Sequence, residues 1–106
     1  MVEAQVISAI AEHIARQFDP QRIVLFGSHA RGEAGPRSDV DLLVVLDKVS
    51  DKRQIAVAIR RSLSGFHVAK DIVVTTPEEI ERRGNLVGAI LRPALRDGRV
   101  LYERGR

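Results

Sequence analysis

Two short stretches of the sequence contain the groups best suited to chemistry. Gly27-Ser28 follows one apolar run, and Asp39 and Asp41 stand one residue apart at the start of another. A glycine-serine turn that opens a helix presents backbone N–H groups and a hydroxyl to phosphate oxygens. Carboxylate oxygens are the ligands that Mg²⁺ prefers. In this order and this close together, the two stretches predict a site that holds a nucleoside triphosphate through metal ions.

A third aspartate, Asp71, begins a later apolar run that is rich in β-branched residues. Asp39 and Asp41 point to the same face of a strand, with Cα atoms roughly 6.5 Å apart at a rise of about 3.3 Å per residue. If the strand of Asp71 lies beside theirs, its carboxylate falls within about 5 Å of an aspartate on that strand. Three such carboxylates repel one another, so we expect them to bind two divalent ions roughly 3.5–4 Å apart. The alternative is that all three are solvated residues at turns and strand ends.

Two further side chains lie in the glycine-serine stretch. Arg31 follows Ser28 by three residues, and we expect its guanidinium to reach the phosphate tail; the alternative is an ordinary surface arginine. His29 has no partner in the sequence that would give it a chemical role, so we expect a partly exposed loop histidine. Tyr102 is the only tyrosine, and no aromatic platform for stacking single-stranded nucleic acid is visible.

Composition limits the class of protein. A chain of 106 residues suits a single domain over residues 1–106, and its zero cysteines exclude disulfides and thiolate chemistry. There is no apolar run near 18 residues and no signal-peptide pattern, so we expect a cytoplasmic protein without a membrane span. The 17 lysines and arginines against 14 aspartates and glutamates give a net charge of +3. This excess suits a triphosphate, an acidic partner or nucleic acid.

The hydrophobic periodicity predicts alternating helices and strands. We expect helices over residues 3–17, 28–31, 51–64 and from 77 onward, the last continued or restarted over 86–95, and strands over 23–26, 40–46, 71–75 and 100–102. Asp51 and Thr76-Pro77 are typical helix starts. The predicted fold class is α+β, close to α/β: a small mixed sheet of three to four strands flanked by helices.

Three segments carry a resemblance to a known family: Phe26–Ala34, Ser38–Val44 and Asp71–Val74. They resemble the nucleotidyltransferase superfamily that includes DNA polymerase beta and the kanamycin nucleotidyltransferases. More narrowly, they are similar to the minimal nucleotidyltransferases, the MNT antitoxins encoded beside HEPN-domain RNases. The resemblance implies the polymerase beta-like fold and a role for each motif residue. Gly27 and Ser28 would hold the β- and γ-phosphates, with help from Arg31. The carboxylates of Asp39 and Asp41 would bind two Mg²⁺. Asp71 would complete the site and accept the proton of the attacking hydroxyl.

The resemblance also implies an activity. All three acidic positions are filled, so we expect an active Mg²⁺-dependent enzyme that transfers AMP from ATP to a hydroxyl, a tyrosine of the cognate HEPN toxin, and silences that RNase. The short chain favours an acceptor supplied by another molecule. Three alternatives stay open: an antitoxin that only binds its toxin, a homodimeric transferase for small molecules such as aminoglycosides, and a nucleic-acid-binding module. The nucleotide preference, the number of nucleotides added and the oligomeric state, including any assembly with the toxin, are also left open.

Overall fold

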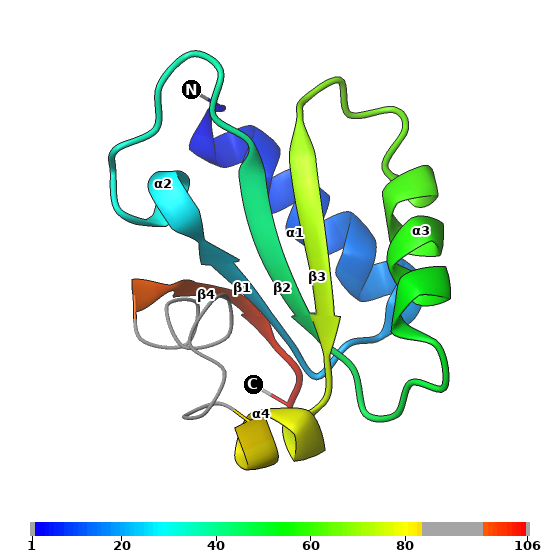
Figure 1. Ribbon diagram of the computed structural model, residues 1–106. Coiled ribbons are helices and arrows are strands. Elements are labelled where there is room, and N and C mark those ends of the chain that lie inside the picture. The colour runs from blue at the N-terminus through cyan, green and yellow to red at the C-terminus, as the bar shows by residue number, and fades with distance from the viewer. Residues whose placement is uncertain (1, 84–96, 106) are drawn as a thin grey trace.

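Helices and strands follow one another in the predicted order. The computed structural model describes residues 2–83 and 97–105 (Figure 1). Its elements are α1 (Ala4–Phe18), β1 (Arg22–Phe26), α2 (Gly27–Ala30), β2 (Val40–Val45), α3 (Lys52–Ser62), β3 (Lys70–Thr75), α4 (Pro77–Arg83) and β4 (Arg99–Glu103). The predicted ends are displaced by one or two residues, as is usual at frayed termini. The helix expected over residues 86–95 lies outside the described residues.

The four strands form one mixed sheet in the order β3-β2-β1-β4. β1 runs antiparallel to both β2 and β4, whereas β2 and β3 run parallel. Parallel neighbours need a crossover connection, and α3 provides it between β2 and β3 (Figure 1). The predicted small mixed sheet flanked by helices is therefore confirmed.

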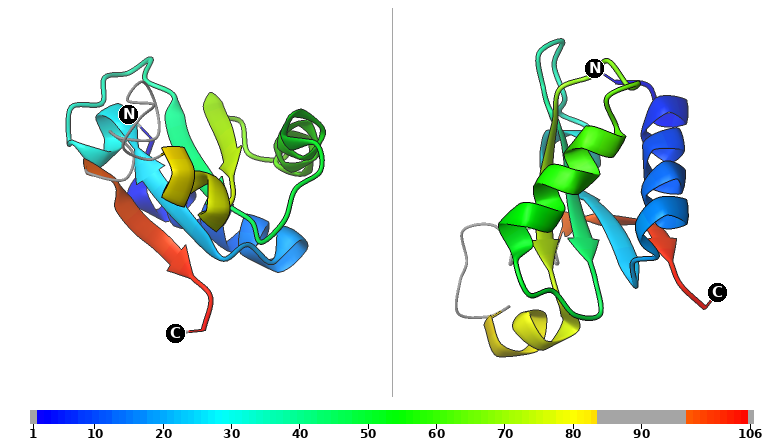
Figure 2. Two further views of the ribbon diagram at one scale, coloured as in Figure 1. Left: turned by 60° about the horizontal axis from the view of Figure 1, so that its bottom comes forward. Right: turned by 90° about the vertical axis from the view of Figure 1, so that its right-hand side faces the viewer.

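The two long helices α1 and α3 cover the same face of the sheet (Figure 2, right). Strand side chains alternate between faces, so Val40, Leu42 and Val44 of β2 join the helices in one fully buried core. Asp41 and Leu43 therefore point to the opposite face. There a smaller apolar group, Val24, Leu43 and Val45, packs with residues that include Ile80 of α4. The alternation explains why an apolar strand can begin with a carboxylate that avoids the main core.

Two predicted helix starts are present as hydrogen-bonded caps. The carboxylate of Asp51 accepts a bond from the N–H of Gln54 at 3.1 Å at the start of α3. The hydroxyl of Thr76 accepts one from the N–H of Glu79, also at 3.1 Å, at the start of α4. Such caps satisfy N–H groups that have no partner within the helix. They fix where α3 and α4 begin and so the lengths of the loops at this end of the sheet.

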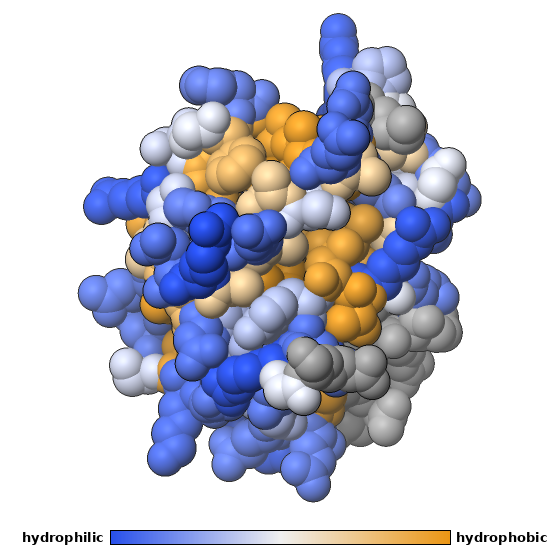
Figure 3. Space-filling model, turned by 180° about the vertical axis from the view of Figure 1, so that it is seen from behind, coloured by the Kyte–Doolittle hydropathy of each residue, from blue (hydrophilic) through white to orange (hydrophobic). Residues whose placement is uncertain are grey.

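The surface is largely hydrophilic with scattered apolar patches. Seen from behind, apolar residues reach the surface in the middle of the face, and hydrophilic residues lie around much of them (Figure 3). Among the described residues the large apolar side chains that are exposed are Val57 and Val100. No helix built from the described residues combines the length and apolarity that crossing a bilayer requires.

Candidate active site

The glycine-serine turn and the aspartate pair meet at one end of the sheet. β1 ends at Phe26, which pairs in register with Asp41 of β2. The chain then turns into α2 at Gly27, whose φ of 74° is in the left-handed region that favours glycine. A Cβ on Gly27 would lie 2.2 Å from Oδ2 of Asp41. The Asp41 carboxylate therefore packs directly against the backbone of the turn, so the predicted phosphate turn and one predicted metal ligand are adjacent.

Asp71 lies beside Asp41 across the parallel pair β2–β3, where the two are register partners. The predicted neighbourhood of these two strands is thus confirmed. Asp41 is half-buried, whereas Asp39 and Asp71 are exposed. Burial raises the pKa of Asp41 above its ordinary value, and the charges of Asp71 and Asp39 raise it further. The charges of Asp39 and Asp71 are therefore close enough to repel that of Asp41. A bound cation would relieve this repulsion.

The three carboxylates do not, however, converge on one point. Within residues 2–83 and 97–105 no three acidic or histidine side chains gather as a ready-made metal cage. Oδ1 of Asp71 instead lies 3.6 Å from a guanidinium nitrogen of Arg60 on α3. Mutual repulsion and the attraction of Arg60 both favour separated carboxylates. The donor set, oxygens from two adjacent strands, fits a hard divalent cation, and ligation by Asp39, Asp41 and Asp71 stays a prediction.

The predicted phosphate ligands lie on the same turn. Ser28 is half-buried within α2, directly after Gly27. Arg31 caps the end of α2, and its Nε donates a 2.8 Å bond to Oε1 of Glu33. The positive charge of Arg31 is also near enough to Asp41 to lower the pKa of that carboxyl. Arg31 is thus at the edge of the site, and its role toward phosphate stays a prediction.

The expectation for His29 is wrong. The side chain is 9% exposed rather than solvated. Its Nδ1 lies 3.0 Å from the carbonyl oxygen of Asp39, and its Nε2 accepts a 3.2 Å bond from the N–H of Val2. A short helix that opens directly from a buried strand must turn some side chains inward, and in α2 those are His29 and Ala30. The apolar run directly before the glycine-serine turn is therefore the feature of the sequence that could have predicted the burial of His29.

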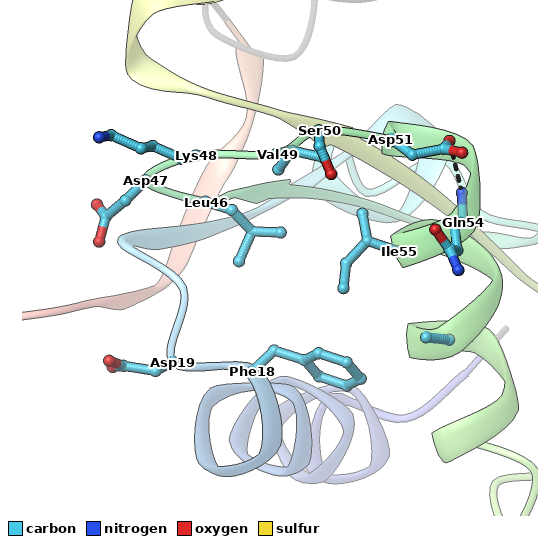
Figure 4. Close-up of a pocket in the computed structure, with 11 residues that line it drawn as sticks. Phe18, Asp19, Leu46, Asp47, Lys48, Val49, Ser50, Asp51, Gln54 and Ile55 are labelled. Atoms are coloured by element: carbon cyan, nitrogen blue, oxygen red, sulfur yellow. Dashed lines mark hydrogen bonds between the residues drawn. The ribbon is translucent and has the colours of Figure 1, made fainter.

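A cavity of about 670 Å³ lies at the opposite end of the sheet (Figure 4). Phe18, Leu46 and Ile55 face it from α1, the end of β2 and α3, and acidic residues that include Asp19 and Asp47 lie around them. None of the six predicted site residues lines this cavity. The chemistry-bearing residues and this hollow are therefore separate features of the fold.

Comparison with known proteins agrees with the fold and with the predicted class of enzyme. Residues 7–97 match the nucleotidyltransferase domain family, and the chain belongs to that family. It is a nucleotidyltransferase, as the sequence motifs predict. A curated relative in Methanocaldococcus jannaschii, named "Putative protein adenylyltransferase MJ0604", is 33% identical over 82 residues, which cover 77% of this chain and 78% of the relative.

Solved structures share the fold at lower identity. A crystal structure from Sulfolobus solfataricus, described as a "putative nucleotidyltransferase", superposes with a TM-score of 0.65 at 23% identity and covers 94% of this chain and 79% of that one. A toxin-antitoxin solved with AMP-PNP gives 0.65 at 19% identity, covering 92% and 74%. A mutant of the toxin-antitoxin MntA-HpeT gives 0.59 at 18% identity, covering 99% and 76%. These likenesses establish the nucleotidyltransferase architecture.

Proposed function

We propose that this nucleotidyltransferase transfers AMP from ATP to a hydroxyl of a partner protein in a Mg²⁺-dependent reaction. The observation that carries the proposal is the position of Asp41, which lies against the Gly27 turn and beside Asp71. A triphosphate lying on that turn would place its phosphates next to the carboxylates. The single domain of residues 1–106 would then supply the nucleotide site, and the partner would supply the acceptor.

Each site residue has a distinct task in this proposal. The backbone at Gly27 and the hydroxyl of Ser28 bind the β- and γ-phosphates, and Arg31 offers its guanidinium to the same oxygens. Asp39 and Asp41 would hold two Mg²⁺, and Asp71 would complete the set of ligands. Bound divalent ions would neutralise phosphate charge and favour ionisation of the acceptor hydroxyl. The raised pKa of Asp41 suits this role, because a cation offsets the repulsion that disfavours its ionised form.

The transfer itself is an in-line displacement. The acceptor oxygen forms a bond to the α-phosphorus as the bond from that phosphorus to the bridging oxygen breaks, and pyrophosphate leaves with that oxygen. The acceptor proton passes to the carboxylate of Asp71, which is exposed and therefore accessible to an incoming protein. Positioning by the turn and the strands supplies much of the rate enhancement.

We infer that the partner is a HEPN-domain RNase toxin, that the acceptor is one of its tyrosines, and that the modification silences the RNase. The curated relative's name, which specifies protein adenylylation, supports a protein acceptor. The toxin-antitoxin assemblies that share the fold support a toxin as that protein. The net charge of +3 suits an acidic partner as well as ATP. We propose a cytoplasmic location as well, because both ATP and the proposed toxin substrate would be found there.

The test uses ATP labelled at the α-phosphate. The protein is mixed with Mg²⁺, this ATP and the HEPN-domain protein encoded beside it, and label is followed onto protein and onto small molecules. We expect Mg²⁺-dependent label on a toxin tyrosine and loss of RNase activity in step with it. Asp39→Ala and Asp41→Ala should each abolish transfer, whereas undiminished transfer by either variant would overturn the assigned site. Label on a small molecule without any protein partner would favour a small-molecule transferase.

The ion pair between Asp71 and Arg60 favours one alternative, an antitoxin that acts by binding alone. Arg60 engages the carboxylate that would accept the proton. In a protein that acts by binding alone, this ion pair would interfere with no reaction. In that case Asp39→Ala would still neutralise the toxin in cells. Under our proposal the same variant leaves the toxin active.

A further inference from the structure

His29 connects three parts of the chain that are distant in sequence. It belongs to α2, next to Ser28 of the proposed phosphate turn. Its Nδ1 contacts the carbonyl oxygen of Asp39 at 3.0 Å, and its Nε2 contacts the N–H of Val2 at 3.2 Å, just before α1. His29 is 9% exposed, and within the described part of the chain it and Thr75 are the buried polar residues. A buried polar group held at both ends contributes to the position of each partner.

The two contacts assign the proton on the ring. The N–H of Val2 can only donate, so Nε2 must be the unprotonated, accepting nitrogen. The carbonyl oxygen of Asp39 can only accept, so Nδ1 must be the donating N–H. One neutral tautomer satisfies both bonds. His29 therefore donates its only ring proton to the backbone that carries Asp39.

We propose that His29 is a positioning residue that fixes the Asp39 backbone relative to the Gly27–Ser28 turn, so that the Asp39 carboxylate can ligate a divalent ion beside the nucleotide phosphates. The proposal rests on the function proposed above. Asp39 comes just before β2, which begins at Val40. The peptide between the two residues is held on one side by the N–H of Val40, which donates to the carbonyl oxygen of Ala69 at 2.9 Å. On its other side, the carbonyl oxygen of Asp39 accepts the bond from His29, which ties this peptide to α2 and so to the Gly27–Ser28 turn.

A purely structural role makes a different prediction. If His29 only joined α1 to the rest of the fold, the bond to Val2 would matter as much as the bond to Asp39. If His29 positions Asp39, only the second bond affects the metal site. Groups that orient metal ligands typically change metal affinity by about 10–100-fold when they are removed. The two bonds can be removed separately, because they use different ring nitrogens.

Two variants separate them. In His29→Asn the side-chain amide nitrogen takes the place of Nδ1, so the bond to Asp39 is kept and the bond to Val2 is lost. In His29→Gln the amide oxygen takes the place of Nε2, so the bond to Val2 is kept and the bond to Asp39 is lost. Each variant loses one hydrogen bond at the same buried position, so the two should unfold at similar temperatures. His29→Ala removes both bonds.

The readout is Mn²⁺ binding to the full chain, without a tag, in the presence of α,β-methylene-ATP, which cannot be cleaved at the reacting bond. Free Mn²⁺ is measured by electron paramagnetic resonance. We expect His29→Gln and His29→Ala to weaken Mn²⁺ binding by about 10-fold or more, and His29→Asn to stay close to the wild type. In the transfer assay the half-saturating Mg²⁺ concentration should rise in the same order.

Equal weakening in His29→Asn and His29→Gln, or no weakening in either, would overturn the positioning role while leaving the proposed function intact. Absence of Mn²⁺ binding by the wild type itself would overturn both. The unfolding temperatures distinguish these results from a general loss of structure. If a variant unfolds below the assay temperature, Mn²⁺ binding by all variants is measured again at 10 °C, where we expect the same ranking of affinities.

Discussion

The carboxylate of Asp41 occupies the space that a side chain on Gly27 would need. Oδ2 of Asp41 lies 2.2 Å from the position of a Cβ at Gly27. Gly27 is therefore required twice, once for its φ of 74° and once for this close approach. The turn proposed to hold phosphate and the carboxylate proposed to hold metal are thus one packed unit, and a change in either should alter the other.

Gly27→Ala should displace Asp41 and reduce AMP transfer by about 100-fold, an effect of the size that misplaced catalytic groups produce. Gly32→Ala is the matched control, because Gly32 has a similar φ of 72° but nothing within 4 Å of its added Cβ. Both variants acquire backbone strain of about 1–3 kcal/mol. Only Gly27→Ala should also lose transfer beyond what its unfolding temperature explains. Equal transfer by the two variants would show that the contact with Asp41 is irrelevant to the reaction.

Asp41→Asn should stabilise the metal-free protein at neutral pH while abolishing transfer. The amide removes a charge that is partly buried and repelled by Asp71 and Asp39. A rise of a few degrees in the unfolding temperature is expected, since about 1 kcal/mol corresponds to about 4–8 °C for a domain of this size. Asp39→Asn, at an exposed position, should give a smaller rise. An unfolding temperature for Asp41→Asn below that of the wild type would contradict the repulsion argument.

The stability of the metal-free protein should depend on pH through Asp41. Its pKa in the folded protein is raised above the unfolded value of about 3.9. Its contribution to stability is therefore fully present below the unfolded pKa and is lost as the pH rises through the folded pKa. Unfolding temperatures measured in EDTA across this range should show that loss, and Asp41→Asn should remove it. A wild type and variant with parallel pH curves would assign the loss to other groups.

If Asp41 ligates the metal as proposed, metal binding should show the opposite pH dependence, because a carboxyl group is a good ligand only when it is ionised. Mn²⁺ affinity should fall as the pH falls through the raised pKa of Asp41. Asp71→Asn removes a repelling charge and should move the midpoint of that fall to lower pH. The measurement is Mn²⁺ titration at a series of pH values. An unchanged midpoint would mean that Asp71 does not influence Asp41.

Arg60→Ala should change metal binding more than it changes stability. Arg60 lies 3.6 Å from Asp71 in an exposed pair, and such pairs contribute about 0–1 kcal/mol to folding. Without this competing cation Asp71 is freer to join a metal, so Mn²⁺ affinity should rise by about 2–5-fold, less than 1 kcal/mol, the size expected for one screened surface charge. Arg61→Ala removes the same charge from the next position and leaves the Arg60–Asp71 pair intact. A matching rise in that control would indicate a general charge effect.

Much of this protein could be predicted from local sequence. The apolar stripe of the first helix, the β-branched run after Asp71 and the caps at Asp51 and Thr76 each carry their structural preference within a few residues. Gly27 followed by Ser28, with Asp39 and Asp41 close behind, likewise indicates its chemistry locally. All these features depend on the spacing of residues along the chain. For this reason the predicted elements agree with the structure, and the predicted family agrees with the family match.

His29 shows where that local information ends. Its neighbours in sequence are small residues, and its two hydrogen-bond partners lie 27 and 10 residues away. The contact between Arg60 and Asp71 likewise depends on tertiary structure, because the two residues meet only after α3 and the crossover to β3 have formed. The sequence by itself determined the elements, the class of enzyme and the candidate ligands, because these follow from short-range patterns. Only the tertiary structure decided which candidate ligands adjoin, that Asp71 pairs with Arg60 and that His29 contacts the Asp39 backbone, because these contacts arise once the strands and helices lie side by side.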